Sequence, residues 1–143
     1  MTRQDVEEVF ARRQEALERH DVVTLALLHS EDGVLESPTA GGIVSGRRAI
    51  EDVYRAWFTA FPDAAFIVDE PLLIDGNRVA QRLTLTGTDT GSFLGLPPTG
   101  KAFRMPIVAL CAMADQQIAH ERRIYDFTGL LIQIGVLKAK PVS

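Results

Sequence analysis

The segment AHERRIYDF (119–127) places a histidine, an arginine and an aspartate close together in a β-rich stretch. Side chains alternate between the two faces of an extended strand, so His120, Arg122 and Asp126 share one face. The opposite face carries Glu121, Arg123 and Tyr125. A polar trio that faces water is an ordinary surface, whereas the same trio in an apolar cavity could act on a substrate. The rest of the sequence has to show whether the chain can form such a cavity.

The chemistry that this trio suggests is proton transfer. A buried Asp126 would have a raised pKa and could remove a proton from the carbon beside a carbonyl group. Arg122 could hold that carboxylate ionised or polarise a substrate oxygen, and His120 could relay a proton. Each residue also has a structural alternative: Asp126 can cap the turn that follows, Arg122 can form an ion pair, and His120 can line an edge. The sequence leaves both sets of roles open.

Composition indicates one ordinary globular domain, residues 1–143, in which 46% of residues are hydrophobic and 24% are charged. A formal charge of −4 without a long Lys/Arg run gives no electrostatic footprint for nucleic acid or an anionic membrane. The N-terminus is not a secretory signal and no stretch reaches transmembrane length, so we expect a cytoplasmic protein. Cys111, the single cysteine, cannot form an internal disulfide, and three scattered histidines do not suggest a metal site.

Three helices are predicted in the first half of the chain. Thr2 and Asp5 form a weak variant of the capping box ahead of an apolar stripe with helical spacing. Asp21 can cap a second, short helix, VVTLALLH. A third apolar stripe runs from residue 50 to residue 61 in steps of three and four, and Pro62 ends it.

The second half of the chain is β-rich. The predicted strands are residues 34–37, 65–74, 78–90, 101–114 and 117–127. Asp75-Gly76-Asn77 and Asp115-Gln116 supply the turns of two antiparallel hairpins. Segment 38–46, PTAGGIVSG, is too rich in Gly, Pro and Ser for anything but a loop, and segment 130–137 is a short apolar tail. Helices followed by long antiparallel strands predict an α+β domain, and such a twisted sheet can curl into a cone with an interior.

The run GTDTGSFLGLPPTGKAF (87–103) and the later Asp126 with its Leu/Gln-rich tail resemble the SnoaL-like polyketide cyclases of the nuclear transport factor two-like superfamily. The resemblance covers roughly residues 5–137 and is most specific over 82–137. It implies a cone-shaped, curved antiparallel sheet with about three N-terminal helices on its concave face, a deep apolar cavity and a homodimer. It also implies that Asp126 is the acid/base group of a ring closure that needs neither metal nor cofactor.

The sequence departs from the family pattern near this aspartate. Many members carry a glutamate and a tryptophan where this chain has His120 and Arg122. Asp89 stands where a histidine is common, and the strand VALCAM (108–113) has no polar residue to assist Asp126.

Two related chemistries of the same superfamily fit less well. The three roles of the ketosteroid isomerases would fall on Ser37, Val108 and Arg13, none of which has the required side chain. The limonene epoxide hydrolases need an Asp-Arg-Asp set, and Arg104 has no carboxylate beside it.

The residues expected to bind a substrate include aromatic side chains of the third helix, which can stack on a flat ligand. The full set is Trp57, Tyr54, Arg82, Phe61 and Leu110. The alternative is that the aromatic residues are simply core and that Arg82 belongs to a dimer face. We therefore predict cofactor-independent cyclisation or isomerisation of a small hydrophobic carbonyl compound. The alternatives are a protein that binds such a molecule without changing it, and hydrolysis of an epoxide.

Overall fold

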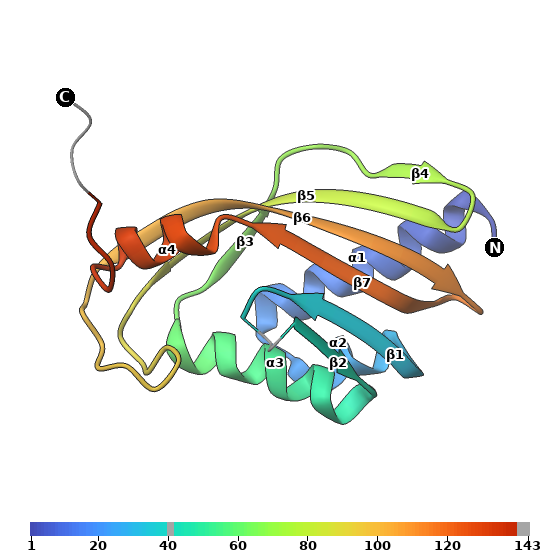
Figure 1. Cartoon of the computed structure of the whole chain (residues 1–143). Coiled ribbons are helices and arrows are strands. Elements are labelled where there is room, and N and C mark those ends of the chain that lie inside the picture. The colour runs from blue at the N-terminus through green and yellow to red at the C-terminus, as the bar shows by residue number, and fades with distance from the viewer. Residues whose placement is uncertain (40–41, 140–143) are drawn as a thin grey trace.

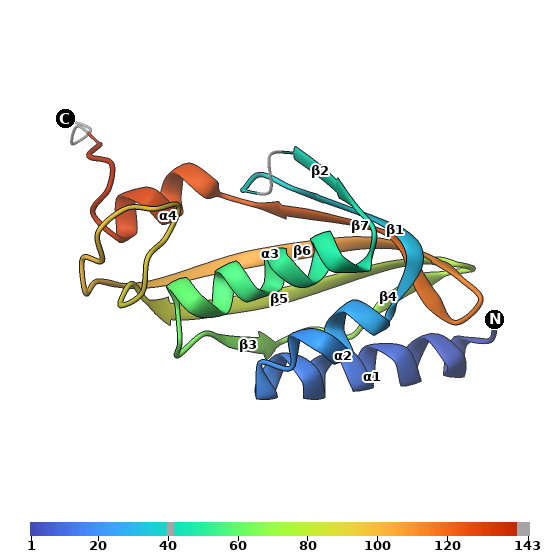
Figure 2. The same cartoon turned by 90° about the horizontal axis from the view of Figure 1, so that it is seen from below.

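The computed structural model describes residues 1–39 and 42–139 of the chain. Figures 1 and 2 show one curved sheet with helices against one face. The helices are α1 (Arg3–Arg19), α2 (Val22–Leu27), α3 (Arg47–Ala60) and α4 (Phe127–Gln133). The strands are β1 (His29–Ser37), β2 (Gly42–Ser45), β3 (Ala65–Val68), β4 (Leu73–Asp75), β5 (Arg78–Thr88), β6 (Ala102–Ala114) and β7 (Gln117–Tyr125).

The sheet has the order β2-β1-β7-β6-β5-β3, and β4 also pairs with β5. Every pairing is antiparallel except β1 with β7, which is parallel. Helices α1, α2 and α3 lie against the same face of the sheet, whereas α4 follows β7 at the far end (Figure 2). The sheet is curved but not closed, so the predicted α+β cone is confirmed, with one parallel pair that the hairpin pattern did not reveal.

The predicted helix starts are confirmed by their caps. Thr2 Oγ1 accepts a hydrogen bond from the Asp5 backbone N–H at 3.1 Å, and Asp5 Oδ2 accepts one from the Thr2 N–H at 2.8 Å. Asp21 caps α2 by accepting from the Thr24 N–H at 3.1 Å. These contacts satisfy N–H groups that a helix cannot pair internally.

Two strand predictions are wrong in detail. Segment 65–74 is not one strand, because β3 and β4 are separate and both pair with β5. Segment 38–46 is not only a loop, since Gly42–Ser45 form β2 and pair with β1. Edge pairing gives partners to backbone groups of this short stretch, which outweighs its low strand propensity.

A β-bulge in β7 decides which side chains face the helices. Met113 pairs with Ile118, but the next pair is Ala112 with His120, so Ala119 has no partner on β6. An extra residue reverses the alternation of side chains beyond it. Ile118 is buried and faces inward, and after the bulge the inward positions are Glu121, Arg123 and Tyr125.

The core consists of two hydrophobic groups that meet along α1. Val6, Val9 and Phe10 belong to one group, and Ala16 and Leu17 belong to the other. Arg13 lies between them in the helix and is also buried. Within the described part of the chain, no helix has the length and apolar character needed to cross a membrane.

Candidate active site

The trio His120, Arg122 and Asp126 lies on the outer face of the sheet. Asp126 is exposed and caps α4, because its Oδ1 accepts a hydrogen bond from the Gly129 N–H at 2.8 Å. The side chains of Arg122 and His120 are 55% and 41% exposed, and both contact Glu36 on β1. The expectation that Asp126 points into an apolar cavity is wrong, because the bulge turns this set of side chains outward.

The inner face of β7 instead carries Glu121, whose side chain is fully buried among three basic side chains. Arg123 Nε donates to Glu121 Oε2 at 2.6 Å, and Arg13 Nη2 donates to the same oxygen at 3.2 Å. The other oxygen, Oε1, lies 3.1 Å from His29 Nε2. Arg13 also donates to Gln81 Oε1 at 2.8 Å. We call Arg13, His29, Tyr54, Gln81, Glu121 and Arg123 the inner polar cluster.

Electrostatics keep Glu121 ionised. Burial alone would raise the pKa of its carboxyl, but Arg123, Arg13 and His29 together hold that pKa well below its ordinary value. The pKa of Arg123 is raised despite burial, because Glu121 stabilises its charge. Burial raises the pKa of Tyr54, so its hydroxyl stays protonated. The cluster therefore offers protonated donors, and its one carboxylate is already engaged.

Three donors of the cluster have no hydrogen-bond partner among the described residues. By distance and angle these are Arg13 Nε, Arg123 Nη2 and the Tyr54 hydroxyl, although the Arg13 guanidinium lies close enough to the Tyr54 hydroxyl to interact with it. These three residues line an enclosed pocket of about 20 Å³. The remaining lining residues are largely apolar: Leu17, Trp57, Phe66, Leu83, Leu85, Ile107, Ala109 and Tyr125. A pocket of this size holds about one water-sized group, and its free donors are suited to an oxygen atom.

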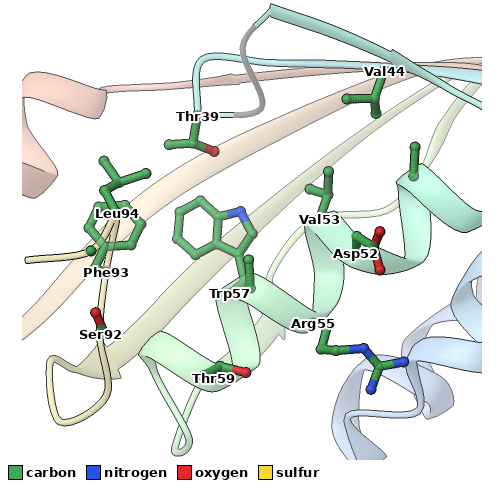
Figure 3. A pocket seen from close by; sticks show the side chains of 13 residues that line it. Thr39, Val44, Asp52, Val53, Arg55, Trp57, Thr59, Ser92, Phe93 and Leu94 are labelled. Atoms are coloured by element: carbon green, nitrogen blue, oxygen red, sulfur yellow. The ribbon is translucent and has the colours of Figure 1, made fainter.

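A much larger groove, of about 710 Å³, lies outside this inner pocket. Figure 3 shows its walls, which are α3, the side chains of Thr39 and Val44, and the loop residues Ser92 to Leu94. Trp57 lines both the groove and the inner pocket, so its indole separates them. The ring packs against Phe93 at 5.6 Å and Tyr125 at 5.8 Å between centroids.

The structure places the expected substrate-binding residues in two different regions. Tyr54 and Trp57 line the inner pocket, and Phe61 is fully buried behind Trp57 with 5.6 Å between ring centroids. Arg82 and Leu110 point to the outer face, where Arg82 Nη1 lies 3.3 Å from Asp69 Oδ2. A cavity position for these last two is wrong, because their neighbours in β5 and β6 are the inward-facing residues.

Sequence reasoning missed most of the inner polar cluster. Arg13 gave one usable signal, since it interrupts an otherwise apolar helical stripe. Gln81 gave a similar one, because it alternates with the buried residues Val79 and Leu83. His29 is fully buried, and its Nδ1 lies 2.9 Å from the carbonyl oxygen of Leu25 in the last turn of α2. Glu121 and Arg123 became identifiable only when the bulge was known.

Metal ligation is not indicated by the described residues. Across residues 1–39 and 42–139, no group of three or more His, Cys, Asp or Glu side chains could hold a metal ion. Cys111 is buried, which raises the pKa of its thiol to about 12.

The model of the SnoaL-like polyketide cyclase family matches residues 7–134, which is most of the chain. The chain is a member of the SnoaL-like polyketide cyclase family. No protein of curated function is similar enough in sequence to count as a match.

Solved structures agree with this SnoaL-like assignment. TsrD from Streptomyces laurentii has 22% sequence identity and a TM-score of 0.83, over 96% of this chain and 99% of TsrD. AclR from Streptomyces galilaeus, a candidate hydroxylase, has 24% identity and a TM-score of 0.83, over 98% and 87% of the two chains. IdmH from Streptomyces antibioticus, a candidate polyketide cyclase, has 28% identity and a TM-score of 0.75, over 90% and 97%.

Proposed function

We propose that this SnoaL-like chain is a cofactor-independent enzyme that cyclises or isomerises a largely apolar carbonyl compound. The carbonyl oxygen binds to the free donors of Arg13, Arg123 and Tyr54 in the inner pocket. The observation that carries this proposal is a pocket with mostly apolar walls lined by three residues, each of which has a buried donor without a hydrogen bond of good geometry.

The donors are suited to the charge that develops in such a reaction. Removing a proton from the carbon beside a carbonyl group transfers negative charge to the oxygen. Fixed donors in a site that excludes water stabilise this charge strongly, since they need little reorganisation during the reaction. Glu121 cannot serve as the base while its charge is paired with two guanidinium groups. Its role in the proposal is to position Arg123.

The body of the substrate occupies the groove, because the inner pocket is too small for more than the reacting oxygen. Trp57 has to move aside for a molecule to reach both compartments. Among the described residues that line the groove, Asp52 is the one carboxylate, and it is exposed. It lies two residues from Tyr54 in α3 and so on nearly the opposite side of the helix, which does not suit it to remove a proton beside an oxygen bound at Tyr54. The proposal assigns the base to no residue of the groove.

The acid/base role expected of Asp126 remains a separate prediction. Its carboxylate caps α4 at the outer surface and does not line either compartment. Replacing Asp126 by Asn keeps a capping side chain, so turnover of this variant tests the catalytic role without removing the cap.

The test uses exchange of carbon-bound hydrogen, which does not require the natural substrate. The chain is incubated with 2-tetralone in D₂O, and deuterium uptake beside the carbonyl is followed by NMR. We expect uptake above the buffer rate, and a loss of about 10²-fold in Tyr54→Phe. Arg122→Gln, on the outer face, should keep the wild-type rate.

Uptake at the buffer rate in the wild type would refute enolisation by this site. Equal rates in the wild type and Tyr54→Phe would refute the role of the donors. A large loss in Asp126→Asn would support the acid/base role of Asp126.

A second candidate is binding without chemical change. It is favoured by one observation: the carboxylate of the inner polar cluster is already neutralised by Arg13 and Arg123. Binding of 2-tetralone, seen by calorimetry, without deuterium uptake would establish this alternative.

The expected homodimer also remains a prediction. The outer face of the sheet carries half-buried Val108 and Leu110, and Ile124 there is 51% exposed. Such a face is suited to a second copy of the chain. Light scattering should give a mass near twice 15.7 kDa, and a monomer mass would exclude the dimer.

A further inference from the structure

The inner polar cluster carries an excess of positive charge. The side chain of Arg13 is 4% exposed and that of Arg123 is 9% exposed, and Glu121 is the carboxylate that forms salt bridges with them. Tyr54 stays neutral because burial raises its pKa. Two guanidinium groups against one carboxylate leave at least one positive charge without a counter-charge in the described part of the cluster. An uncompensated charge in a buried site costs several kcal/mol.

His29 does not supply a counter-charge to the cluster. Its Nδ1 lies 2.9 Å from the Leu25 carbonyl oxygen, and its Nε2 lies 3.1 Å from Glu121 Oε1. Glu121 is therefore the one anionic group in the described part of the cluster.

The free donors and the excess charge occur at the same place. Arg123 Nη2 and Arg13 Nε belong to the two cationic groups, and the Tyr54 hydroxyl belongs to the ring that lies under Arg123. The centre of the Arg123 guanidinium is 4.6 Å from the centroid of that ring. All three residues line the inner pocket. An anionic oxygen there would accept hydrogen bonds and also supply the missing counter-charge.

We propose that the inner pocket is selective for an anion, and that the ligand of this protein is an apolar compound ending in a negatively charged oxygen. The charged group is a carboxylate or the enolate of an acidic 1,3-dicarbonyl compound. The inference rests on the proposed function for the location of the site, and it adds the charge of the ligand.

The test compares matched ligands that differ in charge. 3-Phenylpropanoate and 3-phenylpropanamide have the same apolar body, but only the first is anionic at pH 7. Benzoylacetone, titrated across the pH at which it ionises, tests the enolate. Dissociation constants are measured at constant ionic strength from the emission of Trp57, the single tryptophan of the chain, and by calorimetry.

We expect the carboxylate to bind at least about tenfold more tightly than the amide, which corresponds to about 1.4 kcal/mol. Arg123→Gln should remove most of this preference. Arg122→Gln is the matched control, because the neighbouring arginine points to the outer face and pairs with Glu36. It should keep the full preference.

Tyr54→Phe provides a second variant if Arg123→Gln does not fold. It removes a hydrogen bond to the anion but no charge, so both ligands should bind more weakly while the preference for the carboxylate remains. If enolate but not carboxylate is preferred, the ligand is the dicarbonyl compound.

Equal affinity for the carboxylate and the amide, together with equal affinity for neutral and ionised benzoylacetone, would overturn the inference. A preference for the anion that survives in Arg123→Gln would also overturn it. These results are independent of turnover. Deuterium uptake without a preference for anions would leave the proposed enzyme intact and refute its anionic ligand. A preference for anions without deuterium uptake would support the anionic ligand and refute the proposed enzyme activity.

Discussion

The two tyrosines of the chain should respond in opposite directions to the loss of their hydroxyl groups. The Tyr54 hydroxyl is buried and has no hydrogen bond of good geometry among the described residues. The Tyr125 hydroxyl forms hydrogen bonds with Ser37 Oγ at 3.0 Å and Thr39 Oγ1 at 2.8 Å. The sequence has no further tyrosine, so the two Tyr→Phe variants form a complete matched pair.

The magnitudes follow from the cost of an unsatisfied polar group. A buried hydroxyl without a partner costs about 1–3 kcal/mol, so Tyr54→Phe should raise the free energy of unfolding by about 1 kcal/mol. Tyr125→Phe loses two hydrogen bonds, each with a net value of about 0.5–1.5 kcal/mol, so it should lower that free energy by about 1–2 kcal/mol. The two variants should therefore differ by about 2–3 kcal/mol, and their Tm values by several degrees.

Urea unfolding followed by circular dichroism measures both free energies, with the slope of each transition as a check on two-state behaviour. A loss of more than about 1 kcal/mol in Tyr54→Phe would show that the hydroxyl has a partner in solution, and the reasoning about free donors would be wrong. A gain in stability together with a loss of ligand binding is the expected pattern for a functional group held at some cost to the fold.

Three further predictions concern charge, the groove and the outer aspartate. The folded-state pKa of Glu121 lies below its unfolded value of about 4.5, so its stabilising contribution is present above that pH and is lost as pH falls. The free energy of unfolding should therefore decrease as the solution is acidified, and it should depend less on pH in Glu121→Gln. Ala56→Phe places a large side chain in the groove and should weaken 3-phenylpropanoate binding about tenfold or more, whereas the exposed control Ala11→Phe on α1 should not. If calorimetry gave the same dissociation constant for the wild type and Ala56→Phe, the groove would be ruled out as the ligand site. Asp126→Ala should lose about 1 kcal/mol in urea unfolding through its cap, and Asp126→Asn should lose little; a similar loss in both would contradict the capping role.

Local patterns in the sequence were sufficient for most of the elements. The three N-terminal helices follow from apolar spacing and from caps such as Thr2 and Asp21, because these interactions join residues only a few positions apart. The β6–β7 hairpin follows from its turn, where Asp115 and Gln116 both adopt positive φ angles. The motif around residues 87–103 was specific enough to suggest the family that the comparison established.

The inward face of β7 was not accessible from the sequence. Both faces of this strand mix polar and apolar residues, so the two-residue alternation was compatible with either choice. Pairing with β6 and β1 leaves Ala119 as the bulge, and that single residue moved Asp126 outward and Glu121 inward. Strand partners distant in the sequence set this register, so no local pattern could indicate it.

What the sequence by itself determined is the class of fold, the order of most of its helices and strands, and the family. Only the tertiary structure decided that Arg13 from α1 and Arg123 from β7 meet at Glu121, and that Trp57 separates a small inner pocket from a large groove. The physical reason is the distance along the chain over which each kind of interaction acts. Helix caps and turns depend on neighbours along the chain, whereas a buried charge or a cavity depends on every element packed around it.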